Sequence, residues 1–141
     1  MGMKNLFVIV LIMFSFCAIN AQTKPTPAAF SPLPPKLYKV LRDSCTQMDI
    51  VFTTGAGGSM SLEGRNVIMF STFVAPQSIP AKKDVEKTGF IMWQKNGREF
   101  ITGDIYFQSD TAGYLVFKKD EKEYVNQLST QGATFLRRQK K

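Results

Sequence analysis

The sequence contains no histidine. This absence excludes Ser-His and Cys-His nucleophile pairs, histidine metal sites and the most common general base near neutral pH. Enzyme chemistry would have to rest on carboxylates, lysine or tyrosine. The candidate acids are Asp49, Glu63, Glu99 and Asp104, and no pair of them has a spacing that forces proximity. A non-catalytic protein is therefore favoured, with a carboxylate-based hydrolase or transferase as the alternative.

Cysteine is also scarce, with Cys17 and Cys45 as the two thiols of the chain. Cys17 lies in an N-terminal segment that we expect to be removed, which leaves Cys45 alone. One thiol can form neither an internal disulfide nor a structural zinc site, so stability must come from the core. We expect Cys45 to be a small buried hydrophobe, and the alternative is a thiol that bonds another chain. No metal and no cofactor are predicted.

The first 21 residues have the pattern of a secretory signal peptide. Lys4 precedes an apolar run at 6–17, which is too short for a membrane-spanning helix, and Ala21 supplies a small residue for cleavage. We predict an exported protein, periplasmic or secreted, with no transmembrane segment in the mature chain. A lipid-anchored form acylated at Cys17 is disfavoured because the bulky Phe16 precedes that cysteine.

Proline and basic residues mark the two ends of the mature chain. Residues 22–35 are rich in proline, which favours an extended tether before a single domain at 36–138. The net charge is +7, and much of it lies at the C-terminus in Arg137, Arg138, Lys140 and Lys141. The basic tail at 139–141 predicts at most a weak contact with an anionic surface, and nucleic acid is an improbable partner for an exported protein.

The segment at 89–108 is the clearest structural signal. Two runs of β-branched and aromatic residues flank Asn96-Gly97, a pair typical of a type I′ hairpin turn. Counting outward from the turn pairs Trp93 with Phe100 and Met92 with Ile101. This register assigns one face of the hairpin to the core, with Gly103 leaving room for a close neighbour; the other members of that face are Phe90, Met92, Ile101, Ile105 and Phe107.

The second face of this hairpin is the candidate ligand-binding site. It is apolar but carries polar groups at Thr102 and Asp104, so it needs either a cover or a ligand. The partner would be a small apolar ligand or a protein. The alternative is a helix or second sheet that packs on this face. The four predicted ligand-binding residues are Ile91, Trp93, Phe100 and Tyr106.

The remaining patterns predict several further elements. A helix is expected at 35–44 and a strand at 48–54, followed by a glycine turn at 55–58. A second hairpin is expected at 59–73 around Gly64-Arg65, with Met60, Leu62, Val67 and Met69 on one face. Residues 75–88 are expected to be an irregular connection.

After the turn at 109–113, a strand is expected at 114–119. Residues 120–131 favour a helix, because Asp120 and Glu123 resemble a capping box and Gly132 follows. The alternative pairs two strands around Asp120-Glu121. A closing strand is expected at 133–138, with Arg137 and Arg138 as edge charges.

Together these patterns predict an α+β domain. Its mostly antiparallel sheet has six or seven strands built from sequential hairpins, with a short helix before it and one near the C-terminus. A small all-β barrel is the alternative. The predicted function is that of a small exported binding or interaction domain.

Overall fold

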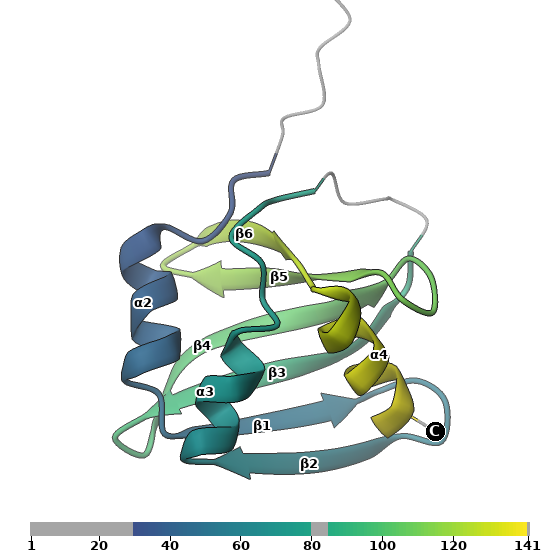
Figure 1. The fold of residues 1–141 in the computed structure, drawn as a ribbon, viewed down its shortest axis with the longest axis horizontal. Coiled ribbons are helices and arrows are strands. Elements are labelled where there is room, and N and C mark those ends of the chain that lie inside the picture. Colours follow the sequence, from purple (N-terminus) through teal and green to yellow (C-terminus); the bar gives the residue numbers. More distant parts are fainter. Residues whose placement is uncertain (1–29, 80–84, 141) are drawn as a thin grey trace, which may run out of the picture.

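The computed structural model describes residues 30–79 and 85–140. The predictions on the signal peptide, on Cys17, on most of the tether and on Lys141 lie outside the described residues. The elements are α2 (Pro35–Asp43), β1 (Gln47–Phe52), β2 (Gly58–Glu63), α3 (Arg65–Ser71), β3 (Lys87–Lys95), β4 (Arg98–Phe107), β5 (Gly113–Lys119), β6 (Lys122–Gln127) and α4 (Thr130–Gln139) (Figure 1).

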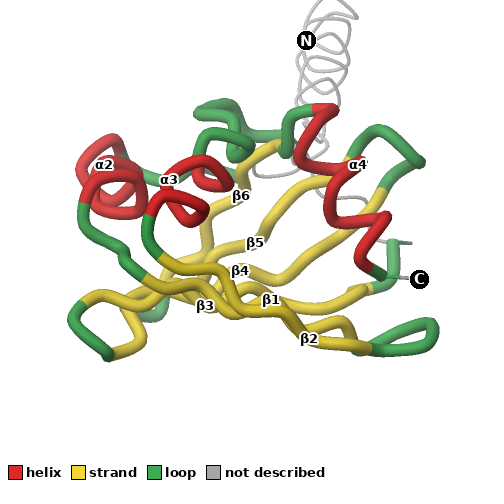
Figure 2. Tube along the Cα trace, turned by 60° about the horizontal axis from the view of Figure 1, so that its bottom comes forward, coloured by secondary structure: helices red, strands yellow, loops and turns green. Residues whose placement is uncertain are grey.

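In the part of the chain that the structure describes, six strands form one antiparallel sheet in the order β2-β1-β3-β4-β5-β6. β2 and β6 are not paired with each other, so the sheet is open and is not a closed barrel. α2, α3 and α4 lie on one side of the sheet (Figure 2). The predicted α+β class is confirmed. None of these helices has the length and apolar character that a membrane span requires.

The helix predicted at 35–44 is confirmed as α2, which begins at Pro35. Proline suits this position because its missing N–H would be unpaired in the first helical turn anyway. The Tyr38 hydroxyl donates a hydrogen bond to the Val74 carbonyl oxygen and ties α2 to the segment after α3. Cys45, just beyond the helix, is 3% exposed, which confirms the predicted burial, and its thiol is free in the structure. Burial raises the pKa of its thiol to about 11.

The second hairpin predicted at 59–73 is wrong. β2 pairs with β1 through the glycine turn, and the chain then forms helix α3 where the returning strand was expected. Gly64, at a φ of 55°, turns the chain between β2 and α3. Val67, Phe70 and Ser71 are buried. Their three- and four-residue spacing is that of a helix face, which the period-two interpretation of this stretch missed.

The central hairpin is confirmed, but its predicted register is correct only near the turn. Asn96 and Gly97 have the positive φ values of a type I′ turn, 54° and 71°. Lys95 faces Arg98 and Gln94 faces Glu99 as expected, and then Trp93 faces Ile101. Phe100 is an extra residue in a β-bulge, so the predicted pairing of Trp93 with Phe100 is wrong.

Because of this bulge, each β3 side chain beyond it shares a face with the β4 residues that were predicted to lie on the opposite face. Ile91 and Trp93 join Ile101, Gly103 and Ile105 on the helix side of the sheet, because directly paired residues share a face. The predicted core residues Phe90 and Met92 therefore lie on the opposite side, where they are only partly buried. A one-residue irregularity moves every side chain beyond it to the other face.

The core lies between the helices and the helix side of the sheet, with Trp93 near its centre. The Trp93 ring packs against Phe70 and Phe117, with centroid separations of 6.3 and 5.5 Å. Its indole N–H donates to Ser71 Oγ at 3.3 Å. Gly103 makes this packing possible, because a Cβ there would lie 3.1 Å from the Phe117 ring. The prediction that Gly103 leaves room for a close neighbour is confirmed.

The predicted helix at 120–131 and closing strand at 133–138 are both wrong. The alternative for the first segment is correct, because β6 pairs with β5 around Asp120 and Glu121, whose φ values are 50° and 63°. The next segment is helix α4, in which Ser129 Oγ accepts a hydrogen bond from the Gly132 N–H at 3.1 Å. Residues 130–139 are thus helical with a serine N-cap, and the terminal arginines are not edge charges of a strand.

The end of the predicted tether packs against the sheet. Leu33 is buried, and its N–H donates to Asn126 Oδ1 at 2.8 Å. The Ser31 carbonyl oxygen accepts from the Val125 N–H at 2.9 Å. Residues 31–33 therefore cover part of the outer edge of β6.

Candidate functional site

The side of the sheet opposite the helices carries an apolar surface, which we call the open face. Figure 2 shows that no described helix lies on this side. Strand pairing places Val51, Phe90, Asp104 and Val116 in one row across four strands, because directly paired residues share a face. The partly buried apolar residues of the open face are Val51, Phe90, Met92, Tyr106 and Val116.

The structure does not bring the four predicted ligand-binding residues together. Ile91 and Trp93 are 0% exposed on the helix side. Phe100 lies in the bulge, where the Lys119 ammonium is 4.9 Å from its ring centroid. Tyr106 does lie on the open face, where its ring stacks on Tyr114 at a centroid distance of 5.1 Å.

Sequence reasoning therefore missed Phe90 and Met92 as residues of the open face. One signal in the sequence could have found them. Phe100 and Ile101 are adjacent apolar residues between Glu99 and Thr102, which breaks the strict alternation of a regular strand. Such a break is compatible with a bulge, and the position of the bulge determines which residues of β3 and β4 share a face of the sheet.

Asp104 is the charged centre of the open face. Its carboxylate lies 2.7 Å from Lys87 Nζ and 3.3 Å from Lys118 Nζ, and the residue is 7% exposed. The hydrogen bond from Lys118 to Asp104 raises the pKa of Lys118. Lys87 Nζ also lies 5.8 Å from the Phe90 ring centroid. A nearly buried carboxylate within an apolar surface thus forms ion pairs with two lysines.

Of the other three candidate acids, two have separate hydrogen-bond partners and one is exposed. Asp49 accepts hydrogen bonds from Ser61 Oγ at 2.5 Å and Gln94 Nε2 at 2.6 Å. Glu99 accepts from Thr102 Oγ1 at 2.9 Å, and Glu63 is exposed at the end of β2. β3 lies between the strands of Asp49 and Asp104. The described residues hold no group of three His, Cys, Asp or Glu side chains suited to a metal ion.

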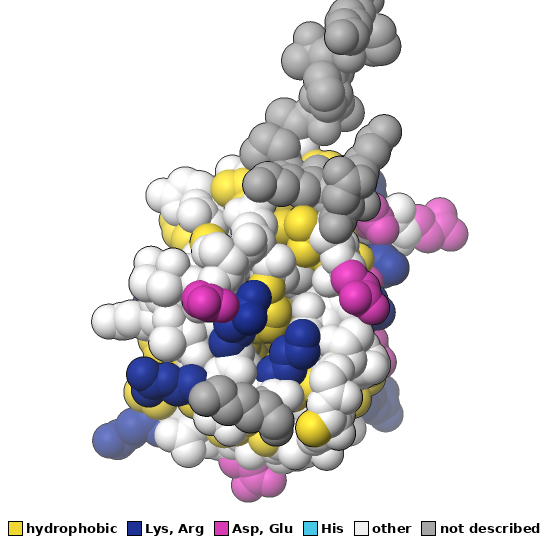
Figure 3. Space-filling view, turned by 90° about the vertical axis from the view of Figure 1, so that its right-hand side faces the viewer, with side chains coloured by type: hydrophobic (Ala, Val, Ile, Leu, Met, Phe, Trp, Pro, Cys, Tyr) yellow, Lys and Arg dark blue, Asp and Glu magenta, His cyan; other side chains and the backbone are white. Residues whose placement is uncertain are grey.

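A second candidate surface is a basic groove beside α4 (Figure 3). The hollow measures ≈ 480 Å³. Arg137 Nη1 lies 3.1 Å from Asp110 Oδ1, and the Arg137 guanidinium carbon lies 5.1 Å from the Phe107 ring centroid. The groove is lined by Asp110, Thr134, Arg137, Arg138 and Lys140.

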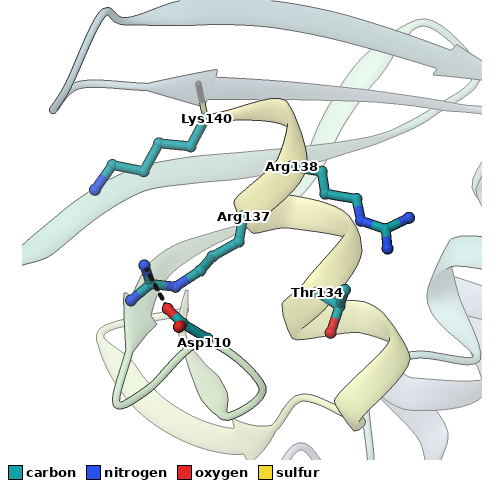
Figure 4. Close-up of a pocket in the computed structure, with 5 residues that line it drawn as sticks. All are labelled: Asp110, Thr134, Arg137, Arg138 and Lys140. Atoms are coloured by element: carbon teal, nitrogen blue, oxygen red, sulfur yellow. Dashed lines mark ion pairs between the residues drawn. The ribbon is translucent and has the colours of Figure 1, made fainter.

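The basic side chains of this groove do not converge on one point. In Figure 4, Arg138 and Lys140 extend to opposite sides of α4, while Arg137 reaches down to Asp110. Arg137 and Arg138 lie in the last turn of the helix, where positive charge interacts favourably with the helix dipole. The arrangement stabilises the helix end and spreads positive charge over a surface, and it does not form a pocket for a single anion.

Comparison with protein-family models, with curated proteins and with solved structures found no match to this chain. Function therefore has to follow from the chemistry of these two surfaces. Of the two surfaces, the open face has the larger set of aromatic and aliphatic side chains. It also contains the Asp104 carboxylate, which is paired with two lysines.

Proposed function

We propose that the protein is an exported, non-catalytic binding domain that takes a partner protein on the open face of its sheet. The observation that carries the proposal is the set of partly buried apolar residues on the open face, which no described helix covers. An antiparallel sheet with one solvated face normally alternates between apolar and polar residues. Phe90, Met92 and Val116 depart from this alternation, and an apolar surface of this kind marks an interaction site.

The chemistry of the open face fits a protein partner. Aromatic residues and methionine are enriched in the buried centres of protein interfaces, and Phe90, Met92 and Tyr106 supply them here. The ion pairs of Asp104 with Lys87 and Lys118 add a fixed charge pattern that a partner can match. Such charges contribute more to specificity and to the association rate than to affinity.

A protein is favoured over a small apolar ligand because of shape. Small-molecule sites are concave and enclose most of the ligand surface. The open face is a pleated surface of neighbouring strands on which Phe90, Met92 and Val116 come from β3 and β5. A broad partner can contact these strands at the same time, and a small molecule would leave most of the surface in water.

Export is part of this proposal and rests on the pattern of the first 21 residues. N-terminal sequencing of the protein recovered from the source cells tests it. We expect the mature chain to begin at Gln22. A protein that retains Met1 in the cytoplasm would contradict export. The hydrolase or transferase alternative stays a prediction. The separate partners of Asp49, Glu99 and Asp104 do not favour it.

Binding at the open face is tested by quantitative capture from an extract of the cell envelope. The immobilised proteins are the mature chain, a Phe90→Gln/Met92→Gln variant, and a Lys36→Gln/Lys39→Gln control altered on the exposed side of α2. We expect at least one protein to be retained by the mature chain and the control and lost with the face variant. Equal capture by the face variant would contradict the proposal, provided that its thermal melting shows it is folded.

A further inference from the structure

The two outer strands of the sheet differ in how their edges are covered. Along β6, the Val125 N–H donates to the Ser31 carbonyl oxygen and the Gln127 N–H donates to the Gln77 carbonyl oxygen, both at 2.9 Å. Gln127 also accepts from the Ala75 N–H at 2.7 Å. No described segment forms such bonds with β2 on the side away from β1, and β2 is the outermost strand in Figure 1.

The alternation of hydrogen bonds along β2 shows which of its backbone groups do not bond to β1. The Gly64 N–H donates to the Thr46 carbonyl oxygen at 2.9 Å, and bonded pairs alternate along an antiparallel ladder. By this alternation Leu62 and Met60 bond to Met48 and Ile50 of β1. The N–H and C=O groups that point away from β1 are therefore those of Ser59, Ser61 and Glu63.

β2 also lacks the features that usually protect an edge strand. Native edges are blunted by lysine, proline or a bulge. β2 has the sequence GSMSLE, with one charge at its end, and its register with β1 is regular from Gly58 to Glu63. The strand is thus a regular and unprotected template for pairing.

We propose that a second copy of this chain pairs with β2 in antiparallel fashion, about a two-fold axis at Ser61. Directly opposed residues must share a face of the joined sheet. With the axis at Ser61, Met60 lies opposite Leu62 of the second copy on the helix side, and Ser59 lies opposite Glu63 on the open-face side. The outward groups of Ser59, Ser61 and Glu63 then form about six hydrogen bonds between the copies.

An axis at a neighbouring position fits less well. An axis between Met60 and Ser61 would set residues of opposite faces against each other. An axis at Met60 would leave Glu63 opposite Gly57, which lies outside the strand. The Ser61 axis uses all three outward-pointing residues of β2.

Apolar side chains beside β2 favour the same contact. Met60 and Leu62 are only partly buried against the core. Ile68 and Met69 of α3 are 46% and 56% exposed, and α3 packs over β2 on the helix side. Pairing of two copies would bring these residues near the joint, and their burial would stabilise it. Because β6 is covered, the pairing closes as a two-fold dimer and does not extend into a filament.

Two lysine substitutions test the axis. Ser61→Lys would place two ammonium groups opposite each other, so we expect the dimer dissociation constant to rise by about ten-fold or more. Ser59→Lys would place lysine opposite Glu63 of the second copy, so we expect the dimer to be kept or tightened. Ser59 and Ser61 are both exposed. Analytical ultracentrifugation of the mature protein over a range of concentrations measures the dissociation constant, and thermal melting checks folding.

A monomeric mature protein at the highest concentration would overturn the proposal, as would a dimer that Ser61→Lys leaves intact. If Ser61→Lys and Ser59→Lys both dissociate the dimer, the axis at Ser61 is wrong. The Phe90→Gln/Met92→Gln variant should remain dimeric, so failure of the open-face proposal and failure of the dimer are distinguishable.

Cysteine cross-linking gives an independent measurement. In a bonded antiparallel pair the Cα atoms are about 5.5 Å apart, within the range of a disulfide. Ser61→Cys should therefore form a covalent dimer on mild oxidation. Ser59→Cys is the matched control, since its counterpart would lie four residues away, about 13 Å along the strand. Equal cross-linking of the two variants, or none with Ser61→Cys, would contradict the proposed axis.

Discussion

The two faces of β3, the first strand of the central hairpin, have similar composition and different surroundings. On the helix side, Ile91 and Trp93 are 0% exposed beneath the helices. On the open face, Phe90 and Met92 are partly exposed, and Asp104 is held by two lysines. Since the side chains at 90–93 are apolar on both faces of β3, hydrophobicity alone does not show which face is buried. What distinguishes them is the bulge at Phe100, which sets the orientation of β3 relative to β4.

The largest difference between the faces is expected from removal of an aromatic ring. Trp93→Ala leaves a cavity among Phe70, Phe117 and Ser71, and we expect a loss of about 3–5 kcal/mol in the free energy of unfolding. Phe90→Ala on the open face should cost about 1 kcal/mol. Urea denaturation of both variants measures the contrast. Equal losses would show that the two faces do not differ in packing.

Deletion of Phe100 tests the bulge itself. Without this residue, Gln94 can still face Glu99 and Trp93 can still face Ile101 in a regular ladder. We expect a folded protein that is less stable by about 1–2 kcal/mol, because the Lys119 contact with the Phe100 ring is lost. Trp93 fluorescence should remain that of a buried indole. A red-shifted, quencher-accessible emission would mean that the deletion had exchanged the faces.

Thiol reactivity should also distinguish the two sides of the sheet. Burial raises the pKa of Cys45 from 9.0 to about 11, so its thiol stays protonated at pH 8 and reacts slowly with a disulfide reagent. A cysteine introduced on the open face by Met92→Cys, in a Cys45→Ser background, should react on the order of ten-fold faster or more. Similar rates for the two thiols would contradict the burial of Cys45.

The raised pKa of Cys45 also gives a sign for the pH dependence of stability. The folded state holds the thiol proton more tightly than the unfolded state does. Its contribution to stability is therefore complete below about pH 9 and is lost as the pH rises through about 11. The difference in unfolding free energy between the native chain and Cys45→Ser, measured from pH 8 to pH 11, should fall over this range. A difference that stays constant with pH would contradict the shift.

Some elements could be predicted because their signals are local. Asn96-Gly97 adopts the positive φ values of its turn, and Pro35 begins α2. The burial of Cys45 followed from the general preference of free cysteine for the interior. These predictions depend on properties of one or two residues and need no knowledge of distant partners.

The failures occurred where two local interpretations competed. Residues 65–71 alternate well enough for a strand, yet they form α3 because Val67, Phe70 and Ser71 pack into the core. Asp120 with Glu123 resembles a helix cap, yet this segment forms β6. Its backbone groups hydrogen-bond to β5 on one side and to Ser31 and Gln77 on the other. Tertiary packing decided both cases, as it routinely does when propensities are nearly balanced.

The sequence by itself determined the class of the domain, the turn at Asn96-Gly97 and the helix before the sheet, because backbone preferences at glycine, asparagine and proline are intrinsic. The tertiary structure alone decided which face of the central hairpin is core, where the chain is helical after β2 and β6, and which edge of the sheet is covered. Faces, registers and edges are properties of pairs of segments. Their free energies depend on contacts between residues far apart in the chain, which a pattern within one segment does not contain.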